Sequence, residues 1–386
     1  MAHSFDDLQL DALRARPLAK WRVYDPDVLP LWVADMDFPV AEPIRAAIRA
    51  YADGDLWGYP SHGGLPGVRE TVCDRMRDRY GWEVEPDHVV LLPGIVAGLY
   101  GGVRAFASHG EGVVTPTPVY PPFRAATESQ GRLYQSADLA EGPDGYRLDG
   151  EALDAAITPA SRLLMLCHPH NPTGRVFDAS ELEALADRVI DHRLWVVSDE
   201  LHADLNFGPQ HRPFATVAPE VATRTVTLVG PTKAFNIAGL KVGFAIATDP
   251  ETRERFRAAL AGLAGPGPSV AQLAAKAAWS EADDWLDDTL AYLRANRDHV
   301  HHAVRERLPG VRMHLPEATY LAWLDFRNTV IADDPAGALL ERGRLALNPG
   351  PSFGEAGRGF ARLNFATSRG IVDEGLDRIA RVLHEG

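Results

Sequence analysis

Side chains capable of acid, base or hydrogen-bonding chemistry follow several short apolar runs of this chain. Lys233 comes soon after VTLV, Asp199 directly follows LWVVS, and Asn171 lies shortly after LLMLC. Lysine is among the residues least often buried without a reason, so its position near the end of a core strand calls for a chemical explanation. Ligands of an open parallel sheet bind outside the carboxyl ends of its strands. We therefore expect these three side chains to share one binding site.

Pyridoxal phosphate is a cofactor that needs such groups together. It requires a lysine amine that forms an imine, a carboxylate that keeps the ring nitrogen protonated, and a donor to its 3-oxygen. Its phosphate suits the free N–H groups of a helix N-terminus, and its flat ring suits an aromatic face. The chain offers these parts, in turn, as Lys233; Asp199; Asn171 with His202; Gly94, Ile95 and Val96; and Tyr120. Each residue alone is more often a surface charge, a cap or a turn residue, whereas the joint arrangement is much harder to obtain by chance.

Alternating helices and strands must position these groups. Short continuous apolar runs predict buried strands at 89–92, 113–115, 163–167, 194–198 and 224–229. A helix is expected over 95–107, and a second over 178–192, where Asp178 and Glu181 have capping-box spacing. The apolar face of the second helix comprises Leu182, Leu185, Val189 and Ile190. This alternation predicts an α/β fold with a mostly parallel sheet covered by helices.

The pattern changes towards both ends of the chain. Residues 1–41 are rich in Pro, Asp and Trp, which predicts an irregular arm that packs with the small domain. Residues 42–280 form the predicted large, cofactor-binding domain. A long amphipathic helix and the strands 319–326 and 359–366 predict a smaller α/β domain over 281–386.

Several motifs resemble the fold-type I aminotransferase superfamily. They include NPTG at Asn171, SDE at Ser198, and TK followed by GLKVGF. More narrowly, the chain is similar to the MalY/PatB-type branch, the cystathionine β-lyases and cysteine-conjugate C–S lyases. The segments that carry this similarity are LWVADMDFP, PHNPTGRVF, VVSDELHADL, TKAFNIAGL, TYLAWLDF and SFGEAGRGFARLNFA, in the expected order over most of the chain.

The resemblance implies a role for each matching residue. Lys233 would carry the cofactor and move the Cα proton, Asp199 would pair with the pyridinium, and Tyr120 would stack on the ring. Asn171 and His202 would contact the 3-oxygen, and His202 stands where many relatives have Tyr. Ile95, Val96 and Thr232 would hold the phosphate. Tyr59 would reach the phosphate of the neighbouring subunit's cofactor, in a homodimer. Arg362 would bind the substrate carboxylate, with Asn171, Ala34 and Asp35 near it.

Two departures bear on the reaction. Lys241 stands where general aminotransferases carry a phosphate-binding Arg and where the lyase branch often has neither. A lysine there can still neutralise phosphate, so we expect it to be buried against that group. The segment 57–70 is closer to the general aminotransferase pattern than to the lyase pattern.

Composition excludes several classes of function. The formal net charge of −14, with no basic run, argues against nucleic-acid partners. No apolar run is long enough to span a membrane, and the N-terminus lacks the core of a signal peptide. Cys73 and Cys167 fit two packed thiols in a reducing cytoplasm. The histidine-rich segment 299–304 has no cysteine or carboxylate set beside it, so no metal site is expected.

The favoured reaction is α,β-elimination on L-cystathionine or another L-cysteine S-conjugate, which yields a thiol, pyruvate and ammonia. An aminotransferase uses the same residues but returns the proton to the cofactor. Oxidative deamination or decarboxylation of a cysteine conjugate on the same scaffold is a further alternative. A non-catalytic regulator is disfavoured by the intact Lys233, Asp199 and Arg362.

Overall fold

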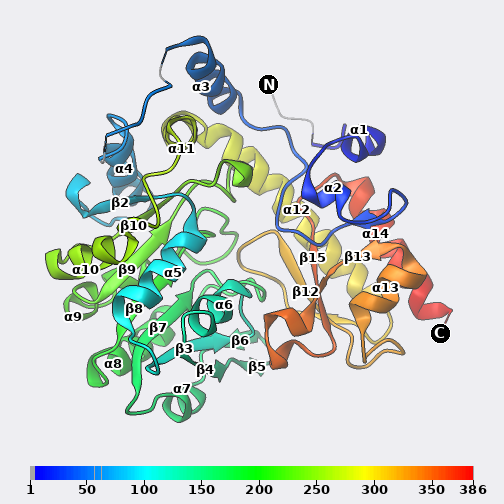
Figure 1. Ribbon diagram of the computed structural model, residues 1–386. Helices are drawn as coiled ribbons and strands as arrows, with labels where there is room; N and C mark the ends of the chain where they lie inside the picture. Colours follow the sequence, from blue (N-terminus) through cyan, green and yellow to red (C-terminus); the bar gives the residue numbers. More distant parts are fainter. Residues whose placement is uncertain (1–4, 56, 62, 386) are drawn as a thin grey trace.

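The central feature of the computed structural model is a mixed sheet of seven strands within the described residues, 5–55, 57–61 and 63–385. Figure 1 shows this sheet in one half of the molecule and a smaller sheet in the other. The strand order is β2-β10-β9-β8-β7-β3-β4. The bounds are β2 Val89–Leu92, β3 Gly112–Thr117, β4 Leu133–Asp138, β7 Ser161–Cys167, β8 Trp195–Asp199, β9 Thr225–Val229 and β10 Gly243–Ile246.

The strands run parallel except at β10, which is antiparallel to both of its neighbours. The mostly parallel α/β sheet is therefore as predicted. Neither β4 nor β10 is predicted from the sequence. The connection 230–242 between β9 and β10 carries Lys233, and β10 then lies between β9 and the edge strand β2.

Helices cover both faces of the large sheet because side chains alternate along its buried strands. On β7, Leu163, Met165 and Cys167 pack towards α5 and α10, whereas Leu164 and Leu166 pack towards α7 and α8. These helices are α5 Ile95–Phe106, α7 Gly150–Ala156, α8 Ala179–Asp191 and α10 Pro250–Leu260, and two further helices are α6 Pro122–Glu128 and α9 Pro219–Ala222.

Helix α8 begins as its sequence predicts. Asp178 is the N-cap, its carboxylate accepts from the Glu181 N–H at 2.9 Å, and both halves of the capping box are present. The predicted apolar face is right for Leu182, Leu185 and Val189. It is wrong for Ile190, which lies at the edge of the stripe and is exposed.

The smaller sheet has the order β11-β12-β15-β14, and all its strand pairs are antiparallel. Its strands are β11 Arg312–Met313, β12 Leu321–Asp325, β14 Asn348–Pro349 and β15 Phe360–Asn364. The helices α12 Asp283–Arg307, α13 Pro335–Gly343 and α14 Arg369–His384 accompany it (Figure 1). The hairpin of β5 Ala140–Gly142 and β6 Gly145–Arg147, which follows β4 in the chain, forms a separate two-stranded sheet.

The N-terminal arm lies beside the small sheet, as Figure 1 shows. Its strand β1, Leu29–Pro30, pairs in parallel with β13, Leu345–Ala346. The prediction of an irregular arm is wrong in part, because α1 Leu10–Arg14 and α2 Ala19–Arg22 form within it. Boundaries at residues 41 and 280 remain our proposal for the division into domains.

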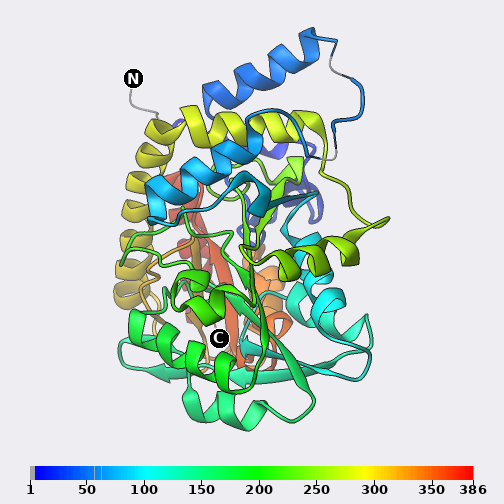
Figure 2. The same cartoon turned by 90° about the vertical axis from the view of Figure 1, so that its left-hand side faces the viewer.

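Three further helices lie along the top of the molecule in Figure 2: α3 Glu42–Asp53, α4 Val68–Tyr80 and α11 Ser269–Glu281. Helix α11 contacts both α3 and α4. Across the described residues, every helix is too short or too polar to cross a membrane.

Candidate active site

A cavity of about 610 Å³ opens at the carboxyl ends of β7 and β8. It brings together side chains from the large sheet, the arm and the small sheet. The predicted residues in its lining are Ala34, Ile95, Val96, Tyr120, Asn171, Asp199, His202, Thr232, Lys233, Lys241 and Arg362. The strand-end argument therefore locates the cavity correctly.

Lys233 projects from the turn after β9 into this cavity. Its Nζ donates to the Ala34 carbonyl at 2.6 Å. Burial lowers the pKa of the amine, with the Arg362 charge acting in the same direction, while Asp35 and Asp199 oppose the shift. A lowered pKa increases the fraction of neutral amine, which is the form that acts as nucleophile or base.

Asp199 is the last residue of β8, and its carboxylate is buried beneath the cavity. One carboxylate oxygen accepts from the Leu201 N–H at 3.1 Å. Burial raises the pKa of the carboxyl to about 7, because the hydrogen bond from the Leu201 N–H and the Lys233 charge offset only part of the lost hydration. A cationic ring nitrogen placed here would restore the ionised form.

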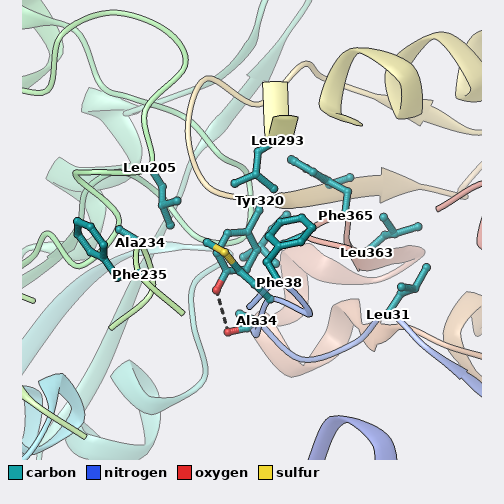
Figure 3. Close-up of a cluster of buried hydrophobic side chains, with 14 of the residues drawn as sticks. Leu31, Ala34, Phe38, Leu205, Ala234, Phe235, Leu293, Tyr320, Leu363 and Phe365 are labelled. Carbon is teal, nitrogen blue, oxygen red and sulfur yellow. Dashed lines mark hydrogen bonds between the residues drawn. The ribbon is translucent and has the colours of Figure 1, made fainter. Parts of the chain in front are cut away.

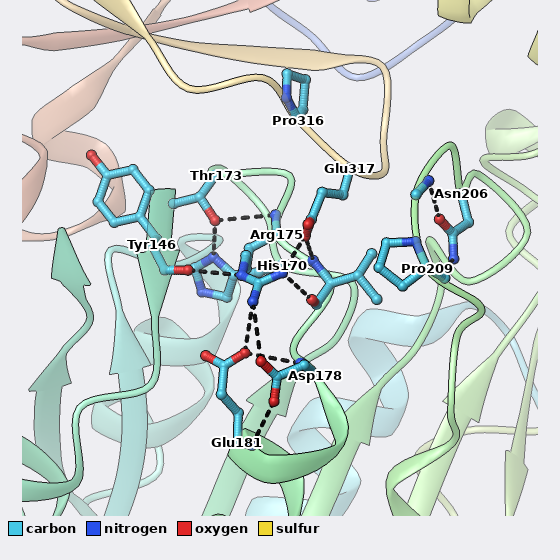
Figure 4. A network of polar contacts seen from close by, with 12 residues as sticks. Tyr146, His170, Thr173, Arg175, Asp178, Glu181, Asn206, Pro209, Pro316 and Glu317 are labelled. Atoms are coloured by element: carbon cyan, nitrogen blue, oxygen red, sulfur yellow. Dashed lines mark hydrogen bonds and ion pairs between the residues drawn. The ribbon is translucent and has the colours of Figure 1, made fainter. Parts of the chain in front are cut away.

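Asn171 lies in a loop that is fixed to the small sheet. Figure 4 shows the Arg175 guanidinium at the centre of this network, donating to Glu181, to Glu317 and to the Tyr146 carbonyl. Gly174 has φ 72°, and a Cβ there would lie 2.3 Å from the Pro316 side chain. The loop thus requires glycine at this position.

The start of α5 forms one end of the cavity. Gly94 is the N-cap with φ 110°, a conformation that favours glycine. Ile95 and Val96 provide the first helical N–H groups, which have no partners within the helix. Thr232 lies in the same cavity lining. This end is suited to bind a phosphate.

Arg362 extends from β15 and is 2% exposed. It donates to Asn171 Oδ1 at 2.8 Å and to the Trp32 carbonyl at 3.2 Å, and it lies over the Phe353 ring at 4.8 Å. Burial lowers the pKa of the guanidinium to about 10, so it stays charged at neutral pH. A buried cation of this kind is suited to bind a carboxylate.

His202 and Tyr120 complete the part of the cavity nearest Asp199. Burial lowers the pKa of His202 to about 3, and the Lys233 and Arg362 charges add to this shift, so the imidazole is neutral. Burial raises the pKa of Tyr120, with Asp199 contributing, so its phenol is also neutral. Both can donate a hydrogen bond without adding charge.

Three predicted residues remain, and one of them, Lys241, differs from expectation. Lys241 lines the cavity but is exposed, because it occupies a left-handed turn with φ 52° at its rim, so the expected burial is wrong. Asp35 is not among the residues that line the cavity, and its charge acts on Lys233. Tyr59 is fully exposed and lies outside the cavity of its own chain.

Other residues of the site are not predicted from the sequence. Trp32 and Asn348 line the cavity, and Tyr320 lies directly behind it, where its hydroxyl donates to the Ala34 carbonyl at 2.9 Å (Figure 3). The register of β14 with β15 sets Asn348 opposite Arg362. The TYLAWLDF motif contains Tyr320, but motif position alone does not reveal a contact with the arm.

The buried polar atoms fit pyridoxal phosphate. Within the described residues, His202 Nδ1 and Arg362 Nε are buried without a hydrogen-bond partner. Such atoms ordinarily have partners, so they indicate that a polar ligand belongs here. The amine, the carboxylate, the phosphate-binding helix start and the aromatic Tyr120 occur in the same cavity.

The model of the family described as "Aminotransferase class I and II" matches residues 26–379. The chain belongs to this family. The cystathionine β-lyase PatB of Bacillus subtilis (strain 168) is 37% identical over 362 residues, with 92% of this chain and 93% of PatB covered.

Two solved structures agree over the whole length. The crystal structure of OvoB has a TM-score of 0.93 and 38% identity, covering 100% of this chain and 99% of its own. The crystal structure of cystalysin from Treponema denticola, which contains pyridoxal 5'-phosphate, has a TM-score of 0.93 and 30% identity, with both chains fully covered. The fold is the fold-type I transferase fold, and the resemblance to the MalY/PatB-type branch is confirmed.

Proposed function

We propose that the chain is a pyridoxal phosphate-dependent carbon–sulfur β-lyase that acts on L-cystathionine or another L-cysteine S-conjugate. The observation that carries this proposal is the pairing of Lys233 and Arg362 across one cavity, with Asp199 at its base. The 37% identity to a cystathionine β-lyase over nearly the full length supports the choice of reaction.

The residues that hold the cofactor are proposed from their positions. Asp199 would pair with the ring nitrogen, Asn171 and His202 would donate to the 3-oxygen, and Tyr120 would offer its aromatic face to the ring. The start of α5 with Thr232 and Lys241 would hold the phosphate, and Lys233 would provide the covalent attachment. The bound cofactor supplies an electron sink for the electron pair left when the Cα–H bond breaks.

Arg362 orients the substrate by binding its α-carboxylate. Its Nε, free of protein partners within the described residues, is available to complete a bidentate interaction. The Ala34 carbonyl, 2.6 Å from Lys233 Nζ, holds the amine near Arg362 and thus near the Cα atom of a bound amino acid.

Once the substrate's amino group has displaced Lys233 from its covalent attachment, the freed amine would accept the Cα proton, which its lowered pKa favours because more of the amine is neutral. The electron pair from the Cα–H bond then forms a double bond between Cα and Cβ, and the Cβ–S bond breaks with its own pair leaving on the thiolate. The three-carbon remainder hydrolyses to pyruvate and ammonia. Neutral His202 and Tyr120 keep additional charge away from the reacting atoms.

We also propose a homodimer in which each chain completes the site of its partner. Tyr59 is fully exposed, and the nearby Trp57 is 66% exposed. Large aromatic residues on a surface are typical of protein interfaces. A cytoplasmic location is proposed as well, supported by the two free cysteines, Cys73 and Cys167.

The test is an assay of the purified protein with cystathionine and with several S-alkyl cysteines. Release of thiol, pyruvate and ammonia in equal amounts is expected, and Lys233→Ala should abolish it. Absence of thiol release from every thioether by a correctly folded, cofactor-loaded protein would refute the proposal.

The second candidate is an aminotransferase. Lys241, placed at the rim beside the start of α5, corresponds to the phosphate-binding Arg of that class. Both reactions begin with removal of the Cα proton, so only the fate of the electron pair separates them.

A further inference from the structure

The loop between β1 and α3 contacts both active-site cations through its backbone. In this arm loop, residues 32–38, the Trp32 carbonyl accepts from Arg362 Nη2 at 3.2 Å and the Ala34 carbonyl accepts from Lys233 Nζ at 2.6 Å. The arm loop therefore sets where the substrate-binding guanidinium and the proton-transferring amine rest. A shift of the loop would move both groups together.

A buried ion pair anchors the far end of the arm loop. Asp37 is 1% exposed and accepts from Lys20 Nζ at 2.7 Å and from Trp21 Nε1 at 3.0 Å. Lys20 is 2% exposed and also donates to the Asp35 carbonyl at 3.2 Å. Arg16 Nη1 donates to the Asp37 carbonyl at 3.0 Å. Three residues of α2 and its preceding turn thus converge on one aspartate.

Side chains in and beside the small sheet also bind carbonyls of the arm loop. Asn364 Nδ2 donates to the carbonyls of Val33 and Asp35, both at 2.7 Å. The Tyr320 hydroxyl donates to the Ala34 carbonyl and is surrounded by apolar side chains such as Phe38 and Phe365 (Figure 3). The arm loop is therefore held at every residue from 32 to 35 and again at 37.

Stability alone is a weak reason for a buried ion pair. Replacing such a pair with apolar residues is often neutral or stabilising, because desolvation of the two charges offsets their attraction. Neither Lys20 nor Asp37 lines the cavity, so they contact no substrate or cofactor directly. Their common effect is to fix the arm loop that carries the Trp32 and Ala34 carbonyls.

We propose that the Lys20–Asp37 pair, with Trp21, is a positioning device that sets the geometry of Arg362 and Lys233 for amino-acid binding. The inference rests on the proposed function in that the ligand is an α-amino acid bound through its carboxylate. It does not depend on which bond breaks afterwards. The predicted phosphate end of the site, at α5, is built from other elements and should be unaffected.

The test compares Lys20→Met with the wild-type holoenzyme in the binding of α-methyl-L-serine. This amino acid has a methyl group in place of its Cα hydrogen and cannot be deprotonated, so its equilibrium binding is measured from the cofactor absorbance without turnover. We expect the Kd to rise about tenfold, the effect of weakening one hydrogen bond to a charged group. The KM for a cleaved thioether should rise by the same factor, and the pyridoxal phosphate content should stay at the wild-type level.

Two further variants separate positioning from folding. Trp21→Phe keeps the aromatic packing but removes one donor to Asp37, and should raise the same Kd about threefold. Arg22→Met removes an exposed cation from the same helix and should leave the Kd unchanged. Among the described residues, the Arg22 side chain donates hydrogen bonds to the carbonyls of Ala15 and Arg16. If Lys20→Met fails to fold, Trp21→Phe decides the matter.

Unchanged binding of α-methyl-L-serine to folded Lys20→Met, or to Trp21→Phe, would overturn the inference. Loss of cofactor in proportion to the loss of binding would overturn it too, because it would indicate general loosening. Failure of the proposed function has a different signature, since wild-type protein would then bind α-methyl-L-serine but release no thiol from thioethers.

Discussion

Replacing Asp199 with asparagine should stabilise the cofactor-free protein at alkaline pH. The same replacement should largely abolish turnover with the cofactor. Burial raises the pKa of the Asp199 carboxyl from 3.8 to about 7. Each pKa unit corresponds to about 1.36 kcal/mol, so the shift of about three units is worth about 4 kcal/mol. The side-chain amide of the Asp199→Asn variant would retain an acceptor for the Leu201 N–H without an ionisable group.

The sign follows from proton binding. Between pH 3.8 and about 7 the folded carboxyl holds a proton that the unfolded one has lost, so the stability contributed by this group falls as pH rises through that window. Above pH 7 the full cost of about 4 kcal/mol is present in the folded wild type and absent from the asparagine variant.

The assay is urea unfolding of both cofactor-free proteins at pH 5 and pH 8. The difference in free energy of unfolding between the two proteins reports on Asp199 alone, because the other ionisable groups are the same in both. The advantage of Asp199→Asn should be larger at pH 8 by about 2 to 3 kcal/mol, since part of the cost is already present at pH 5. Added pyridoxal phosphate should stabilise the wild type more than the variant. An equal difference at both pH values would refute the reasoning.

Four further outcomes are expected. Lys233→Ala should bind no cofactor that borohydride can fix to the chain, as mass spectrometry of its peptides would show. Arg362→Lys should raise KM for amino acids about 10- to 100-fold, because a lysine cannot make the bidentate interaction, and steady-state kinetics measure this. Tyr59→Phe should weaken cofactor retention by about 0.5–1.5 kcal/mol in dialysis experiments if it donates to a phosphate. Gly174→Ala should lower the free energy of unfolding by at least about 1 kcal/mol in urea, because of its positive φ and the contact with Pro316.

The groups at the strand ends can be predicted from the sequence because short apolar runs mark the buried strands. Parallel strands deliver their next residues to one edge, so Asn171, Asp199 and Lys233 converge without any knowledge of side-chain packing. The start of α5 can also be predicted from neighbouring residues, because Pro93-Gly94 directly precedes the helix.

Contacts between distant segments cannot be predicted in this way. Tyr320 reaches Ala34 across 286 positions, and no periodic pattern encodes that pairing. The exposure of Lys241 depends on the left-handed turn in which it lies, which the pattern of apolar residues does not reveal. Strand β10 escapes prediction because GFAI is too short to stand apart from the glycine-rich connection before it.

The most direct test of carbon–sulfur cleavage is whether thiol release continues when no 2-oxo acid is present. The wild-type holoenzyme is given a cysteine thioether without any 2-oxo acid, and thiol is counted per active site over time. A β-lyase continues through many turnovers, with ammonia and pyruvate matching the thiol. Arrest after a single half-reaction, with the cofactor left in its amine form and recovery only when a 2-oxo acid is added, would contradict the account and favour an aminotransferase.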